Sequence, residues 1–202
     1  MKIKYITIER EYGSGGTEIA RRLAEETGIP CYGREILEAV AQTRNLSIDE
    51  IEHYEETVTG SFLYTVYALA QASSGNADML TREGHIFVAE QAEIKQLAGC
   101  GRAIFLGHCA AEALKEEQGV LSVFIRCSDS GEKRRRIVET YGIPEYDAEK
   151  TRKSYDKKRA NYFYANTTRR WNDCGNYGLV LDSAVLGVDG CVAVLKRLLE
   201  QV

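Results

Sequence analysis

Residues 6–25, ITIEREYGSGGTEIARRLAE, hold three signals in an order that decides the fold. An apolar, β-branched run is followed by three glycines within four residues and then by a helical pattern, in which Ile19 and Leu23 share one face. In a strand, loop and helix of this kind, the backbone N–H groups of the loop converge and the helix N-terminus adds its positive end. The layout is therefore typical of a loop that binds phosphate.

The loop lacks the lysine that such loops normally carry. Gly16 stands where the pattern G-x-x-x-x-G-K-[ST] requires lysine, and Arg10 stands at its first glycine. The dinucleotide pattern G-x-G-x-x-G also fails, because a register from Gly13 puts Glu18 at its last glycine. Two interpretations remain: a glycine-rich turn, or a phosphate loop that takes its cation from elsewhere. Arg10 and Arg21 are local candidates, since arginine binds phosphate oxygens in a bidentate way.

The rest of the chain alternates short apolar runs with helical patterns, which is typical of an α/β protein with a mostly parallel sheet. Five strands are expected, at residues 5–9, 30–32, 103–107, 121–126 and 178–182. All but the second are near-continuous apolar runs, as in strands that helices cover on both faces. The chain of 202 residues has no internal repeat or low-complexity linker, so a single domain over 1–202 is expected.

The composition, with 44% hydrophobic and 28% charged residues, is that of a globular chain. A net charge of -4 gives no global attraction to nucleic acid or to an anionic membrane. No window approaches the roughly 18 apolar residues that a membrane helix needs, and no signal peptide is expected. Six scattered cysteines without a C-x-x-C pair favour reduced thiols in a cytoplasmic protein, and the dispersed histidines give no zinc spacing.

Two regions between the strands are mainly helical. In the first, at about 34–98, Ser47 and Glu50 form a capping box. Residues 62–70 of this region make an apolar face typical of packed core or of a partner surface, which leaves a homodimer open. The second, at about 128–165, combines the basic segment EKRRRIVETYG with a long charged helical run.

Together these segments resemble the cytidylate kinase-like proteins, relatives of bacterial cytidylate kinase among the P-loop nucleoside monophosphate kinases. The resemblance runs from ITIEREYGSGGTEIARRLAEETGIPCYGREIL through AIFLGHCAAEAL and LSVFIR to DKKRANYFYANTTRRW and YGLVLDSAVLG. It implies a three-layer P-loop fold with a five-stranded sheet. It also implies that the region at about 34–98 is a helical insertion on the acceptor side, and that the region at about 128–165 is a lid with its flanking helices.

The resemblance further implies MgATP as the phosphoryl donor. By position, the residues at the donor phosphates are Gly13, Ser14, Gly15, Gly16 and Thr17, with the Thr17 hydroxyl at Mg²⁺. The catalytic cations are then expected among Arg10, Arg134, Arg135 and Arg136. Neighbours on a helix point about 100° apart, so one or two of the three adjacent arginines are expected to act.

In cytidylate kinase, an R-x-x-x-D-x-x-R motif binds the sugar and phosphate of the acceptor. This chain has Arg152, Asp156 and Arg159 at that spacing, which falls on one helical face. A solvated stripe of ion pairs is the alternative interpretation of the same residues. Arg34 and His108 complete the acceptor contacts that the resemblance implies.

The chain departs from cytidylate kinase after the third strand, where G-R-D is replaced by Gly107, His108 and Cys109. Neutral His108 is a weaker phosphate ligand than arginine, although protonation restores a positive charge. Cys109 cannot replace a carboxylate that accepts from an exocyclic amine, and packing at the strand end accounts for it.

The leading hypothesis is ATP-dependent phosphoryl transfer to a nucleoside monophosphate, with CMP and dCMP among the acceptors. One alternative is a non-catalytic nucleotide-binding or regulatory protein with a degenerate loop. Another is a P-loop kinase for a different small-molecule acceptor.

Overall fold

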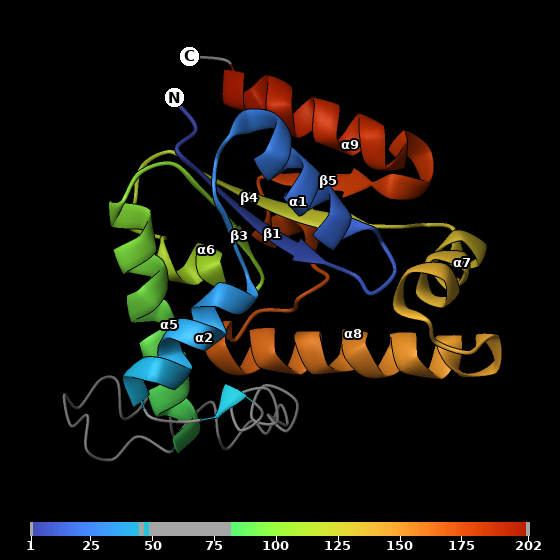
Figure 1. Cartoon of the computed structure of the whole chain (residues 1–202), viewed down its shortest axis with the longest axis horizontal. Helices are drawn as coiled ribbons and strands as arrows, with labels where there is room; N and C mark the ends of the chain where they lie inside the picture. Colours follow the sequence, from blue (N-terminus) through green and yellow to red (C-terminus); the bar gives the residue numbers. More distant parts are fainter. Residues whose placement is uncertain (1, 45–46, 49–81, 201–202) are drawn as a thin grey trace.

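The structure is a computed structural model that describes residues 2–44, 47–48 and 82–200, with side chains from residue 85 onward in the last range. Five parallel strands form one sheet in the order β2-β3-β1-β4-β5 (Figure 1). The strands are β1 (Tyr5–Arg10), β2 (Cys31–Tyr32), β3 (Ala103–Leu106), β4 (Val120–Arg126) and β5 (Leu179–Asp182). The expected five-stranded parallel sheet is confirmed.

Helices cover both faces of this sheet, which explains why its strands read as continuous apolar runs. On one face, α1 (Gly16–Thr27) and α9 (Ser183–Glu200) pack together over a cluster that includes Ile8 and Ile125. On the other face lie α2 (Arg34–Arg44), α5 (Arg82–Gly99) and α6 (Ala110–Ala113) (Figure 1). Residues of all three helices form a buried cluster with Phe105 of β3. The result is three layers.

Parts of the expected insertion lie outside the described residues. The helices α2 and α5 are its two described ends, and they pack against each other. The apolar face at residues 62–70 and the Glu50 half of the capping box are not described, so the homodimer and the cap stay predictions. In the described part of the chain, no helix is both long and apolar enough to span a bilayer.

The expected lid region forms two helices, α7 (Ser130–Tyr141) and α8 (Glu145–Thr167). Asp129 caps α7 because its carboxylate accepts from the N–H groups of Gly131 and Glu132, and Gly142 ends the helix with a positive φ of 65°. Pro144 then precedes α8, which runs beneath the sheet in Figure 1. A single-turn 3-10 helix, η2 (Cys174–Asn176), leads into β5.

Both helices pack against the glycine loop through Tyr12, which is only 8% exposed. The Tyr12 ring stacks between Tyr141 of α7 and Tyr155 of α8, with ring centroids 4.9 and 4.5 Å away. In addition, the Tyr12 N–H donates to Asp156 Oδ1 at 2.7 Å. The loop is thus held from the side of α7 and α8 by stacking and by a charge-assisted hydrogen bond.

Ionisation of Tyr12 should lower the stability of the fold at alkaline pH. Burial, followed by the neighbouring Tyr141 and Tyr155, raises the pKa of Tyr12 from 10.0 to about 12. Because the pKa is raised on folding, the contribution of Tyr12 is intact below pH 10 and is lost as the pH rises toward 12. Tyr12→Phe should reduce the loss of unfolding free energy between pH 10 and 12 by about 1–2 kcal/mol, allowing for solvent screening.

Urea denaturation at several pH values measures this effect. Tyr146→Phe is the matched control, because Tyr146 is 84% exposed and its change should leave the alkaline profile as it is in the wild type. An alkaline profile of Tyr12→Phe that matches the wild type would contradict the assignment.

Candidate functional site

The topology places a crevice at the carboxyl ends of β1 and β4. The chain leaves β1 toward β2 on one side of the sheet and leaves β4 toward β5 on the other, and ligands of open α/β sheets bind at such a reversal. Two cavities lie here, one of about 300 Å³ and one of about 360 Å³. The first, the loop cavity, is lined by Gly13, Gly15, Thr17, Glu18, Arg21, Arg136, Thr140 and Tyr141.

The glycine loop presents unused donors to the loop cavity. Within the described part of the chain, no hydrogen bond is made by the backbone N–H groups of Gly13, Gly15, Thr17 and Glu18. The remaining loop donors are satisfied locally, since Ser14 N–H donates to the Glu11 carbonyl and Gly16 N–H to Ser14 Oγ. Gly15 and Gly13 have φ of 79° and 78°, which only glycine adopts freely. Four unpaired donors at a helix N-terminus match an anion such as phosphate.

Of the three adjacent arginines, the structure brings Arg136 to this loop. Its Nη1 donates to the Ser14 carbonyl at 3.0 Å and to Ser183 Oγ at 2.9 Å, and its side chain is 13% exposed. Arg135 faces away in ion pairs with glutamates of α7, and Arg134 is exposed. The 100° step of the helix separates them, as expected.

A second cation of α7, Lys133, was missed by the sequence analysis. Its Nζ lies 2.8 Å from Glu11 Oε2, which also accepts from the Cys127 N–H at 2.9 Å. Lys133 is buried beside the loop, but it does not line the loop cavity and its charge is neutralised by Glu11. The available signal was helical spacing: Lys133 and Arg136 share the face of the fully buried Ile137.

Arg10 explains why residue 16 is a glycine. A Cβ on Gly16 would lie 2.5 Å from Arg10 Cβ, and a Cβ on Gly107 would lie 2.6 Å from Arg10 Nη1. The Arg10 side chain therefore passes beside Gly16 and ends at the carboxyl end of β3. The two local substitutes for lysine named from the sequence lie in different places: Arg21 lines the loop cavity while it pairs with Glu25, and Arg10 lines the second cavity.

Thr17 is exposed on the first turn of α1 and lines the loop cavity. Its hydroxyl fits Mg²⁺, which in phosphate sites takes few protein ligands and is otherwise bound by phosphate oxygens and water. Among the residues described, no group of three or more His, Cys, Asp or Glu side chains gathers into a metal site. Thr17 is thus the ligand that the chain would supply.

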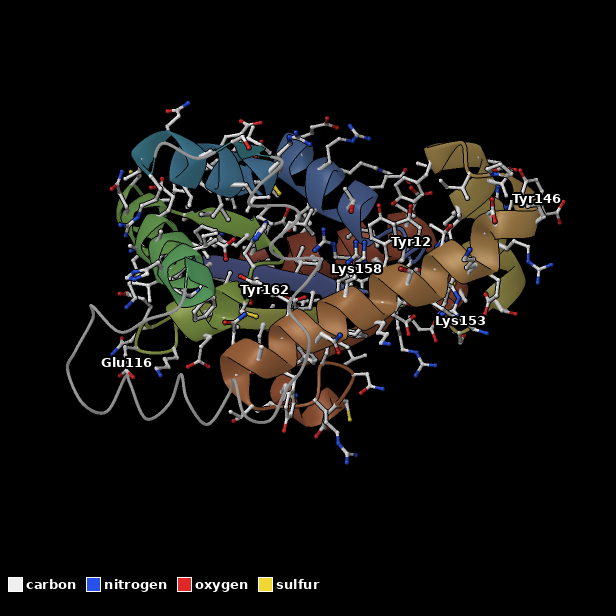
Figure 2. The ribbon with its side chains drawn as sticks, turned by 90° about the horizontal axis from the view of Figure 1, so that it is seen from below. Tyr12, Glu116, Tyr146, Lys153, Lys158 and Tyr162 are labelled. Carbon is white, nitrogen blue, oxygen red and sulfur yellow. The ribbon has the colours of Figure 1, made fainter. Side chains whose placement is uncertain are left out.

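The second cavity, here called the strand-end cavity, is rich in cations. Its lining residues are Glu9, Arg10, Arg34, Leu37, Gly107, His108, Cys109, Tyr155, Lys158, Arg159, Tyr162 and Phe163. Figure 2 shows Lys158 and Tyr162 on the side of α8 that faces the sheet, and Lys153 on the opposite side. Arg34 lines the cavity while it pairs with Glu38 at 3.4 Å. Guanidinium and ammonium groups of this kind bind anionic small molecules.

Two of the three R-x-x-x-D-x-x-R residues, Asp156 and Arg159, contact the backbone at the β1 end, whereas Arg152 pairs with Asp156 and Glu149. Asp156 accepts from the Tyr12 N–H with one oxygen and from Arg152 Nη1 with the other, at 2.7 and 3.0 Å. Arg159 Nη1 donates to the Arg10 carbonyl at 2.8 Å and also lines the strand-end cavity, whereas Arg152 lines neither cavity. Burial raises the pKa of Asp156 above its ordinary value, and the Tyr12 N–H and the arginines oppose the rise.

A buried carboxylate, Glu90, contacts two residues that line the strand-end cavity, and it was not singled out from the sequence. Glu90 accepts from the Tyr162 hydroxyl, and its Oε1 lies 3.8 Å from His108 Nδ1. His108 and Cys109 both adopt left-handed backbone conformations, with φ of 56° and 50°. Cys109 packs among aromatic rings, as expected, and points no strong acceptor into the cavity.

Comparison with known proteins agrees with this geometry. The sequence model of the cytidylate kinase-like family matches residues 5–185. No curated protein matches the chain.

Among solved structures, an uncharacterized protein from Eubacterium ventriosum is 24% identical, with 100% of both chains covered and a TM-score of 0.72. Shikimate kinase from Bacteroides thetaiotaomicron is 13% identical, with 97% of this chain and 98% of that chain covered and a TM-score of 0.51. The protein TT1252 from Thermus thermophilus is 16% identical, with 100% of both chains covered and a TM-score of 0.50. These likenesses show the fold alone, and they confirm the expected three-layer P-loop fold.

The close contact between Arg10 and Gly16 can be tested by stability. Gly16→Ala should lower the free energy of unfolding by about 1–3 kcal/mol, because the added methyl group overlaps the Arg10 side chain. The same change in an Arg10→Gly background should cost less, which gives a measurable coupling energy. Chemical denaturation of the four proteins measures both values.

Gly99→Ala is the control, because a Cβ there meets nothing within 4 Å. A Gly16→Ala protein as stable as Gly99→Ala would show that Arg10 does not occupy this space.

Proposed function

Because the chain belongs to the cytidylate kinase-like family, we propose that it is a phosphotransferase that moves the γ-phosphoryl group of ATP to an anionic small molecule. A nucleoside monophosphate is the leading acceptor class. One observation carries the proposal: a cavity with four unpaired loop N–H groups and a cavity lined by cations both open at the carboxyl end of β1. Phosphoryl transfer needs this pairing, since a donor phosphate and an anionic acceptor must meet in line.

On the donor side, the loop N–H groups would bind the β and γ phosphate oxygens. Arg136 supplies the positive charge beside them, and its bonds to the Ser14 carbonyl and Ser183 fix its position without lysine. Mg²⁺, held by the Thr17 hydroxyl, would neutralise charge on the phosphates when bound.

On the acceptor side, Lys158 and Arg159 of α8 and Arg34 of α2 would hold the acceptor anion. The Arg10 side chain connects the donor and acceptor sides, because its Cβ and Cγ atoms lie beside the loop at Gly16 and its guanidinium lies at Gly107. It can therefore stabilise the negative charge of the transferring group. An acceptor phosphate oxygen would form the new bond to the γ phosphorus while the bond to the ADP oxygen breaks.

A non-catalytic nucleotide-binding protein is the second candidate, and Arg136 is the observation that favours it. Three protein groups already bind its guanidinium: the Ser14 carbonyl, Ser183 Oγ and Glu132. If Arg136 serves only to hold the loop, nucleotide would bind without efficient transfer. In either case the six scattered cysteines, without a C-x-x-C pair, fit a reducing compartment, and we place the protein in the cytoplasm.

Arg136→Ala separates these roles. It should weaken MgATP binding about 10- to 100-fold, which is the effect of losing a charge-assisted hydrogen bond to phosphate. Arg135→Ala, which removes an exposed neighbour, should bind MgATP as the wild type does. Isothermal titration calorimetry measures binding, and a coupled ADP-release assay across the common nucleoside monophosphates measures transfer.

Ser183→Ala is the structural control, because Ser183 Oγ donates to the Ser14 carbonyl at 2.7 Å and carries no charge. Equal losses of affinity in Ser183→Ala and Arg136→Ala would mean that Arg136 only positions the loop. ATP binding without ADP release on any acceptor would favour the non-catalytic candidate, and absence of ATP binding would overturn both.

A further inference from the structure

The wall that α8 contributes to the strand-end cavity is cationic in one part and aromatic in the next. Its lining residues from α8 fall at i, i+3, i+4, i+7 and i+8, which is one helical face. Lys158 and Arg159 make one part of this wall cationic. The next turn contributes Tyr162 (Figure 2) and Phe163, and both belong to a buried aromatic cluster. An acceptor that lies along α8 would therefore place its anion near Arg159 and its apolar body against the aromatic turn.

A carboxylate stands at the aromatic end of the cavity. Glu9, near the end of β1, lines the cavity, and its Oε2 accepts from Trp171 Nε1 at 3.0 Å. Trp171 is 5% exposed and packs in the same aromatic cluster, so it fixes the carboxylate from behind. An indole N–H is a single donor, whereas a carboxylate has about four acceptor sites. Most of the acceptor capacity of Glu9 remains available.

Nothing in the described part of the chain neutralises Glu9. Several cations line the same cavity, yet within that part the Glu9 carboxylate forms no ion pair with them, and its hydrogen-bond partner there is Trp171. The other group at this end, Cys109, offers only a weak sulfur acceptor. Glu9 is thus an oriented, strong acceptor that faces the place where the uncharged end of an acceptor would lie.

We propose that Glu9 determines which acceptor is taken, by accepting a hydrogen bond from an exocyclic amine on the base of a nucleoside monophosphate. A base with a carbonyl at that position would bring its oxygen against the Glu9 carboxylate. Both are acceptors and both would stay unpaired, so such a base should bind more weakly. This inference rests on the proposed function, since it assumes that the strand-end cavity holds the acceptor.

The test compares ligands that differ in one exocyclic group. Calorimetric titration gives the affinities of CMP against UMP and of AMP against IMP, for the wild type and for Glu9→Gln. At least one amine-bearing member should bind the wild type about 10-fold or more tightly than its carbonyl partner. The amide of Glu9→Gln keeps an oxygen for Trp171 but can also donate to a carbonyl. The affinity of the amine-bearing ligand should therefore exceed that of its carbonyl partner by a factor of only about 1–3.

Trp171→Phe is a second variant, which keeps the ring but removes the N–H that orients Glu9. It should lower the amine-to-carbonyl ratio, while Arg159→Ala should weaken both members of a pair alike and keep their ratio. This split distinguishes recognition of the base from a general loss of the cavity.

The ligand affinities test the role of Glu9, and ADP release tests the proposed transfer. Equal wild-type affinities within both pairs, or a ratio unchanged in Glu9→Gln, overturn the role of Glu9, and ADP release with the wild type would then leave the proposed transfer standing. A preference that depends on Glu9 without ADP release on any acceptor would support Glu9 and overturn the transfer. If no member of either pair binds, the role of Glu9 is also overturned.

Discussion

The packing of the Arg10 side chain beside Gly16 is the constraint on which the candidate site depends. With 2.5 Å between Arg10 Cβ and the place of a Cβ on residue 16, a lysine there and this arginine exclude each other. The chain has the arginine, and the Arg10 guanidinium lies beyond the loop, at Gly107 after the end of β3. The cation beside the loop N–H groups must then come from another element, and Arg136 of α7 lies there.

The helices α7 and α8 also set the shape of the loop. They contact three neighbouring backbone groups, because Arg159 donates to the Arg10 carbonyl, Asp156 accepts from the Tyr12 N–H, and Arg136 donates to the Ser14 carbonyl. The tyrosine stack spans the two cavities: Tyr141 lines the loop cavity and Tyr155 lines the strand-end cavity, with Tyr12 between them. Movement of α7 and α8 would therefore change both cavities together.

The sequence predicted the fold well because its signals are local. Short β-rich runs located each described strand of the sheet to within about one residue, as at β1 (Tyr5–Arg10) against the expected 5–9. The glycine loop was also placed correctly, since positive φ at Gly13 and Gly15 requires that residue type.

The site was less predictable because it depends on contacts between distant segments. Helical spacing predicted that one or two of the three adjacent arginines would act, but only the packing of Ile137 selects Arg136. The motif Arg152, Asp156 and Arg159 has the same spacing whether it binds a ligand or a backbone. The structure shows Asp156 and Arg159 on the backbone at the β1 end, with Arg152 paired to Asp156. Glu9 and its partner Trp171 are 162 residues apart, so no local pattern joins them.

The most direct measurement is a crystal structure of the protein with Mg²⁺ and a non-hydrolysable ATP analogue. We expect β- and γ-phosphate oxygens at about 2.7–3.2 Å from the N–H groups of Gly13, Gly15 and Thr17, with Arg136 at the phosphates and Arg10 still beside Gly16. A triphosphate bound away from these N–H groups, or bound to them with neither arginine near its phosphates, would contradict the account of a phosphate loop that works without lysine.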